Sequence, residues 1–102
     1  MTKSELIERT SLKLPHLMQR DIELAINVII DAMIHHLARG ERIEIRGFGG
    51  FSVNQRAARM GRNPKTGEQV NLPIRYTSHF KPGLNLRERV EQSRTAFPIT
   101  DD

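Results

Sequence analysis

The sequence contains no cysteine and no tryptophan, and it has a single tyrosine. The absence of cysteine excludes a disulfide scaffold and a zinc site with cysteine ligands, and it is compatible with the cytosol. No apolar run approaches the roughly 20 residues that a membrane-spanning helix needs, and no apolar core of a signal peptide follows the first residues. We therefore expect a soluble intracellular chain, whose 102 residues suffice for one domain with a small core.

Acidic residues are scarce in one part of the chain. Between positions 56 and 81 the only acid is Glu68, against six basic residues, whereas the formal charge of the whole chain is +4. The six are Arg56, Arg59, Arg62, Lys65, Arg75 and Lys81. A near-neutral body with a basic projection suits a phosphate backbone. The alternative interpretation is a charged hairpin that is simply solvated.

The same segment predicts a long β-hairpin. Two β-like runs, 51–58 and 68–76, flank the turn sequence Asn63-Pro64-Lys65-Thr66-Gly67. Proline pre-sets φ in such a turn, and glycine adopts positive φ without strain. Because the hairpin has few apolar residues near its tip, we expect an arm, about residues 55–75, that projects from the body.

The N-terminal part predicts two helices. Thr2 and Glu5 form a capping-box pattern, so the first helix starts near Lys3, and Pro15 ends it. The second helix runs from about 19 to 39 and carries a broad apolar stripe. The stripe consists of Ile22, Ala25, Ile26, Ile29, Ile30, Met33, Ile34 and Leu37. We interpret its excess width as a subunit interface; an all-helical core within one chain is the alternative.

After Gly40 the apolar period changes from helical spacing to two. Ile43 and Ile45 are expected on one side of a strand, and Arg42, Glu44 and Arg46 on the other. Further along, Phe48 and Phe51 are expected in the core, and Pro73 predicts an edge or a bulge in the return strand. A short helix after Pro82-Gly83 should turn Leu86 and Val90 inward, and residues 95–102 should form a tail. The predicted fold class is α+β, with two helices, a three-stranded antiparallel sheet with an extended hairpin, and a C-terminal helix.

At this level of detail the chain resembles the HU/IHF family of bacterial DNA-bending proteins. The resemblance covers residues 1–94, taken as a single DNA-binding domain. It rests on Gly47-Phe48, Phe51, Arg56, Arg59, Gly61, Asn63-Pro64, Thr66 and the run from His79 to Gly83. Within the family, the charged segment from Gly40 to Gly49 is similar to the β-subunit branch of integration host factors.

The resemblance implies an intertwined dimer whose two arms wrap the minor groove of double-stranded DNA. The family is itself a known case of minor-groove wedging, so Pro64 is expected to intercalate between base pairs. The expected DNA contacts are Arg42, Glu44, Arg46, Arg56, Arg59, Arg62, Asn63, Pro64, Lys65, Arg75, His79 and Lys81. Glu44 is expected to orient Arg46, or else to form an ordinary ion pair. Lys3 and Arg87 are expected either to contact flanking phosphates or to serve only solubility.

The resemblance further implies a nucleoid-associated protein that bends DNA with sequence preference in recombination, replication and transcription. Its partner would be an integration host factor α subunit. The alternative is an HU-like homodimer with little sequence preference. A nuclease using His35, His36 or His79 is a competing class, but no metal-ligand or nucleophile–base spacing supports it. A protein-interaction scaffold is a second competing class. We expect no catalytic residue, metal, cofactor, membrane partner or small-molecule substrate.

Overall fold

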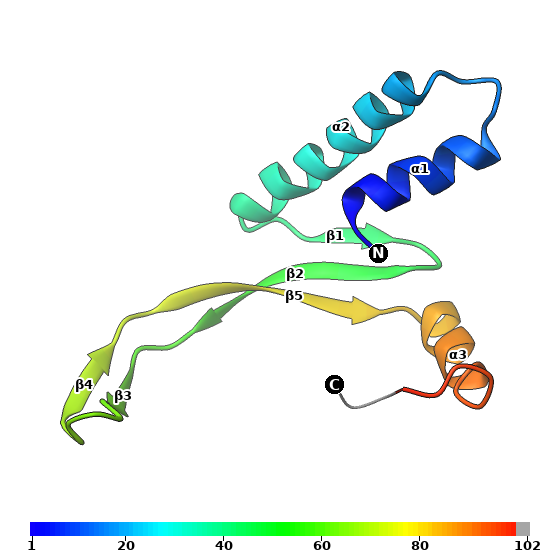
Figure 1. The fold of residues 1–102 in the computed structure, drawn as a ribbon. Helices are drawn as coiled ribbons and strands as arrows, with labels where there is room; N and C mark the ends of the chain where they lie inside the picture. The colour runs from blue at the N-terminus through cyan, green and yellow to red at the C-terminus, as the bar shows by residue number, and fades with distance from the viewer. Residues whose placement is uncertain (100–102) are drawn as a thin grey trace.

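The computed structural model describes residues 1–99, with helices and strands in the order α1, α2, β1, β2, β3, β4, β5, α3 (Figure 1). The helices are α1 (Lys3–Lys13), α2 (Gln19–Ala38) and α3 (Leu84–Gln92). The strands are β1 (Ile43–Ile45), β2 (Gly49–Arg56), β3 (Arg59–Arg62), β4 (Gln69–Leu72) and β5 (Arg75–Pro82). The predicted α+β class and the order of its parts are confirmed.

The first two helices begin and end where local chemistry requires. The Thr2 hydroxyl accepts a hydrogen bond from the backbone N–H of Glu5 at 3.2 Å, which caps the start of α1. At the end of α2, Gly40 adopts φ +77°. There the N–H of Glu41 donates to the carbonyl of His36 at 3.0 Å, which satisfies a carbonyl that the helix leaves free. Both caps were expected from the sequence.

The three-stranded sheet has the order β1-β2-β5, with antiparallel neighbours throughout. Ile43 lies opposite Phe51, and Phe51 lies opposite Phe80. The rings of Phe51 and Phe80 have centroids 4.7 Å apart, and Phe48 lies 5.1 Å from Phe80. This aromatic cluster forms the apolar side of the sheet. Phe51 is half-buried there, whereas Phe48 is exposed within this chain, so the prediction that Phe48 lies in the core is wrong for the single chain.

One register runs along the whole hairpin. Arg56 pairs with Arg75 at the end of β2, and Arg59 pairs with Leu72 at the start of β3, so two residues on each strand separate the two ladders. Pro73 lies between β4 and β5, which are both edge strands, so the prediction of an edge is confirmed, whereas the unbroken register excludes a bulge. Proline donates no ladder hydrogen bond, but no extra residue shifts the pairing.

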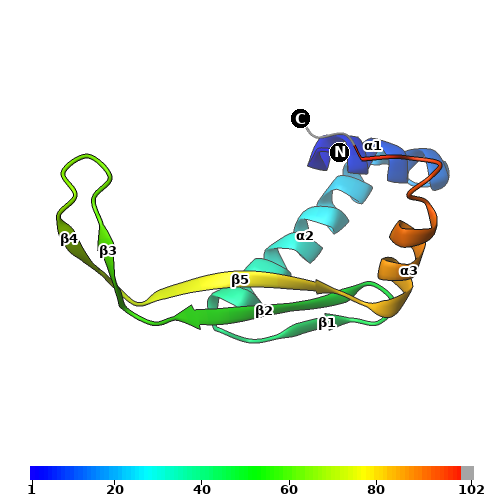
Figure 2. The ribbon, with the colours of Figure 1, turned by 90° about the horizontal axis from the view of Figure 1, so that it is seen from below.

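The hairpin projects far from the helices, as Figure 2 shows. The chain measures 60 × 37 × 28 Å and its radius of gyration is 19.4 Å, whereas a compact domain of this length would have about 13 Å. α1 and α2 lie over one side of the sheet, where α2 contacts β1 and β2 (Figure 1). The arm is therefore an extension that the rest of the chain does not bury.

The C-terminal helix differs in part from its prediction. Leu86 is half-buried, but Val90 is 57% exposed, so within this chain only one of the two residues turns inward. α3 has few apolar residues and lies against one end of the sheet only. A turn follows α3, in which the N–H of Phe97 donates to the carbonyl of Ser93. Positions 100–102 of the predicted tail lie outside the described residues.

Candidate nucleic-acid interface

The side of β2 and β5 that faces away from the helices carries a continuous set of polar residues. Side chains alternate between the two faces of a strand, and the register pairs even positions of β2 with odd positions of β5. We call this side the outer face. It consists of Gly50, Ser52, Asn54, Arg56, Arg75, Thr77, His79 and Lys81. Every one of these residues is neutral or basic.

The opposite side of the same strands is different in kind. Phe51, Val53 and Phe80 alternate with the outer-face residues. A surface pocket lined by Leu37 of α2 together with Val53 and Ser78 places this side next to the helices. The hairpin base is thus amphipathic, with its apolar side turned toward the helices and its basic side turned outward.

The tip of the hairpin is a structured turn. The N–H of Asn63 donates to the carbonyl of Glu68 at 2.8 Å, and the N–H of Gly67 donates back to the carbonyl of Asn63 at 2.7 Å. The Asn63 side chain accepts from the N–H of Lys65 at 2.9 Å. Gly67 adopts φ +73°, which favours glycine. These bonds hold Pro64 at the outermost point of the chain, where its ring is exposed.

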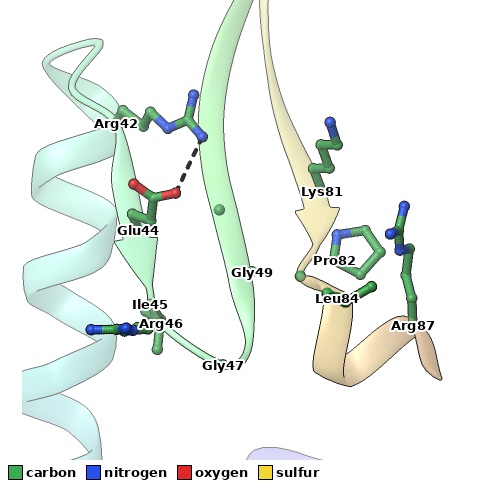
Figure 3. Close-up of a pocket in the computed structure, with 12 residues that line it drawn as sticks. Arg42, Glu44, Ile45, Arg46, Gly47, Gly49, Lys81, Pro82, Leu84 and Arg87 are labelled. Atoms are coloured by element: carbon green, nitrogen blue, oxygen red, sulfur yellow. Dashed lines mark ion pairs between the residues drawn. The ribbon is translucent and has the colours of Figure 1, made fainter. Parts of the chain in front are cut away.

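A hollow of about 420 Å³ opens at the other end of the outer face, next to the start of α3 (Figure 3). Four basic residues and one acid line it: Arg42, Arg46, Lys81, Arg87 and Glu44. Figure 3 shows Arg42 on one side of β2, with Lys81 and Arg87 on the other. We call it the cationic hollow. Its charge and its position at the end of the basic face suit a polyanion that passes over the sheet.

Glu44 pairs with Arg42 in this structure, at 3.6 Å between Oε1 and Nη2. The prediction had coupled Glu44 to Arg46. Arg46 lies in the turn after β1, where strand alternation has ended, and it extends in the opposite direction from Arg42 (Figure 3). The turn is closed by the N–H of Phe48 and the carbonyl of Ile45. Arg42 and Glu44 therefore lie beside the Gly50 end of the outer face, and the Arg46 side chain extends away from them.

Comparison with known proteins identifies the family. Residues 1–91 match the family model described as bacterial DNA-binding protein. The chain belongs to this family. It is 59% identical over 99 residues to the integration host factor subunit beta of Halorhodospira halophila, covering 97% of each chain. It is 56% identical over 96 residues to the protein of the same name from Hahella chejuensis, covering 94% of this chain and 98% of that one.

Solved structures of the bacterial DNA-binding protein family share the fold. An Anabaena HU protein crystallised with DNA has 30% sequence identity and a TM-score of 0.80, with 88% of this chain and 97% of that chain covered. HU from Thermotoga maritima has 29% identity and a TM-score of 0.59, with 88% and 98% covered. The resemblance noted in the sequence is therefore confirmed, including its β-subunit character.

Within this family fold, the predicted contact residues fall into three groups. Arg42, Glu44 and Arg46 surround the cationic hollow, while Arg56, Arg75, His79 and Lys81 lie on the outer face. Arg59 and Arg62 are the end residues of β3, and Asn63, Pro64 and Lys65 form the tip. All are on one continuous hairpin or at its base. Lys3 is elsewhere, and its ammonium donates to Asn27 of α2 at 2.9 Å.

Sequence reasoning missed the small polar members of the outer face. Ser52, Asn54 and Thr77 lie between the basic residues of this face. The signal was available, because Ser52 and Asn54 alternate with Phe51 and Val53. A charge pattern alone does not indicate neutral hydrogen-bonding groups.

Among residues 1–99, no cluster of three histidine, aspartate or glutamate side chains is placed to hold a metal ion. None of the three helices has the length and apolar character needed to cross a bilayer. The family to which the chain belongs is a DNA-binding family, and the nuclease alternative is set aside on that ground.

Proposed function

We propose that this protein is an architectural DNA-binding protein that bends double-stranded DNA, acting as one half of a dimer. The observation that carries the proposal is the outer face, an uninterrupted neutral-to-basic surface that continues from the cationic hollow into a projecting arm. Phosphate contacts from such a surface supply sequence-independent affinity. The relatives named as integration host factor subunits and the HU protein crystallised with DNA support the same function.

The need for a partner follows from exposed apolar surface. A compact monomer of 11.7 kDa exposes about 5,900 Å², whereas this chain exposes 9322 Å². On α2, Ile22 is buried against α1, yet Ile29 on the same stripe is 59% exposed. Phe48 of the aromatic cluster is also 43% exposed. A second chain of the same fold would cover these surfaces, and we propose a related α-type chain, since the relatives are β subunits.

The arm is proposed to bend the duplex by wedging Pro64 between base pairs in the minor groove. Unstacking one base step costs about a few kcal/mol. Arg62, next to the tip, and Lys65, within it, are placed to offset that cost by holding phosphates, and arginine suits a narrow, negative minor groove. Rigidity of the tip supports this role, because the turn hydrogen bonds hold the proline in place before DNA arrives.

Sequence preference and cellular role complete the proposal. Arg42, Glu44 and Arg46 offer contacts outside the arms, which gives a route to selectivity that shape readout alone lacks. The protein would then serve recombination, replication and transcription in the cytoplasmic nucleoid. An HU-like homodimer is the second candidate, because the solved HU structures share the fold.

The test is a bending assay with a duplex that carries a donor and an acceptor dye at its ends. The chain, alone and with an α-type chain, is titrated onto a duplex with an integration-host-factor-type site and onto a scrambled duplex of equal composition. We expect preference for the site, approach of the ends and a gain from the α-type chain. Equal affinity for both duplexes with no partner effect would indicate the homodimer, and no binding at low salt would refute DNA binding.

The wedge is tested in the same assay with Pro64→Ala. We expect the dimer to persist, measured by sedimentation, while the ends of the duplex approach each other less. Pro73→Ala is the matched control, because it removes a proline from the same hairpin away from the tip. Unchanged bending by Pro64→Ala would contradict the wedge and leave DNA binding itself untouched.

A further inference from the structure

The backbone of β2 carries no side chain at one position of the outer face that adjoins the cationic hollow. This position is Gly50, which pairs with Glu44 on one side and with Lys81 on the other. A side chain there would project outward between them, toward the same side as Ser52 and Asn54. Gly50 needs no unusual backbone conformation, since its φ is not positive. Its lack of a side chain is therefore not required by the backbone.

Arg42 occupies the space above Gly50. A Cβ added at Gly50 would lie 3.3 Å from Nη2 of Arg42 and 3.9 Å from the central carbon of its guanidinium. The same Nη2 atom is 3.6 Å from Glu44 Oε1. The guanidinium thus leans along the sheet over β2 and is held there by one acid. It reaches the edge of β2, and Lys81 lies on the other side of that strand (Figure 3).

We propose that Gly50 is a positioning residue for DNA recognition, because its open surface lets Arg42 lie across the sheet as an additional phosphate contact in the cationic hollow. The inference rests on the proposed DNA-binding function. A Cβ at position 50 would shift the guanidinium by a few tenths of an ångström, and a branched side chain such as valine would move it further off the sheet. Arg42 would then remain charged but would be free in solvent, where an exposed pair with Glu44 fixes it weakly.

The electrostatics of the hollow favour this role. Glu44 alone balances four basic residues there, so the pair it forms leaves the hollow cationic. Arg42 and Glu44 are both exposed, with 65% and 74% of their side-chain areas accessible. A phosphate therefore reaches the guanidinium without displacing protein. Arginine presents a fork of donors, so it serves the carboxylate and a phosphate oxygen together.

The experiment measures the dependence of DNA affinity on salt for four proteins in the dimeric form that binds DNA. They are the parent chain, Arg42→Met, Gly50→Val and the double variant. Each phosphate contact contributes about 0.9 to the slope of log K against log salt. We expect Arg42→Met to reduce the slope by about 0.9 per copy of the chain and Gly50→Val to reduce it by a similar amount. The slope of the double variant should be no lower than that of either single variant.

Two controls separate positioning from damage to the sheet. Gln55→Val places the same valine at an exposed position of the same strand but on the opposite face, away from Arg42, and is expected to leave the slope unchanged. Gly50→Ala is the milder variant and should give a smaller reduction. Thermal unfolding of each variant checks that the sheet is intact, since valine is favourable in strands.

The outcomes distinguish this inference from the proposed function. If Gly50→Val keeps the parent slope while Arg42→Met lowers it, then Arg42 contacts DNA without help from Gly50 and the inference is overturned. If the reductions of the two single variants add in the double variant, then Gly50 acts through another group, and the inference again fails. In both cases DNA binding stands. If the parent chain shows no salt-dependent binding, then the proposed function itself fails.

Discussion

Two arginines of the outer face lie directly opposite each other. Arg56 and Arg75 form the last pair of the β2–β5 ladder, just before the hairpin continues into the arm. Residues in such a pair have Cβ atoms about 4.5–5.5 Å apart, and like charges there destabilise the sheet. No acid of the outer face offsets them. The free protein therefore carries a repulsion that a bound phosphate would relieve.

We predict that Arg56→Gln changes stability and DNA binding in opposite directions. Cross-strand pairs contribute about 0.2–1 kcal/mol, so removing the repulsion should stabilise the hairpin base by an amount in that range. The gain should vanish near 1 M salt, where the Debye length is about 3 Å. The slope of log K against log salt for DNA should fall by about 0.9 per copy of the chain.

The assay for stability is amide hydrogen exchange of β2 and β5, because it reports local opening at the hairpin base rather than global unfolding. The double variant Arg56→Gln, Arg75→Gln should gain no more protection than either single variant, since one substitution already removes the repulsion. Its salt slope should nevertheless fall by about 1.8 per copy. Stability is thus expected to be non-additive, and phosphate binding additive.

Lys81→Gln is the matched control for this prediction. Lys81 lies on the same outer face but opposite Gly50, so it has no like charge across the ladder. Its replacement should lower the salt slope without raising protection. The reasoning would be refuted if Arg56→Gln lowered protection at low salt, or if it left the salt slope of DNA binding unchanged.

Two further predictions concern the body of the molecule. Gly49→Ala should destabilise the fold by about 1–3 kcal/mol through overpacking, because the new Cβ would lie 2.6 Å from the carbonyl of Lys81 and 2.7 Å from the Phe80 ring. Denaturant unfolding measures the loss of stability, with Ser52→Ala as a control that should cost little. A Gly49→Ala variant as stable as the parent chain would contradict the prediction. Ile29→Glu should dissociate the dimer, because Ile29 is one of the exposed residues of the α2 stripe. Sedimentation, with Asp31→Asn as the control, measures this, and a dimer of unchanged affinity would show that the stripe is not the interface.

Much of the fold follows from local rules. The Thr2 cap, the break before Pro15 and the left-handed Gly40 each act within one turn of chain, so the sequence indicated the helix boundaries to within a residue or two. The change of period after Gly40 likewise located β1. The hairpin was predictable because its turn residues and flanking β-branched and aromatic residues agree.

What the sequence left open depends on contacts between distant segments. Pairing of Glu44 with Arg42 rather than Arg46 follows from where β1 ends, and no spacing rule states that. Val90 was expected to be inside because it follows Leu86 at helical spacing, yet α3 meets only one end of the sheet. The space over Gly50 is likewise a consequence of register, which sets Arg42 and Lys81 on either side of it.

The uninterrupted register of the hairpin restricts how the arm can change length in evolution. A single residue inserted into one strand would turn every later side chain to the opposite face, and it would move the basic residues of the arm relative to Arg56 and Arg75. Lengthening must therefore come as matched additions of two residues to each strand. Each such addition would carry Pro64 about 7 Å farther from the body. The distance between the body and the tip can therefore change only in steps of about 7 Å.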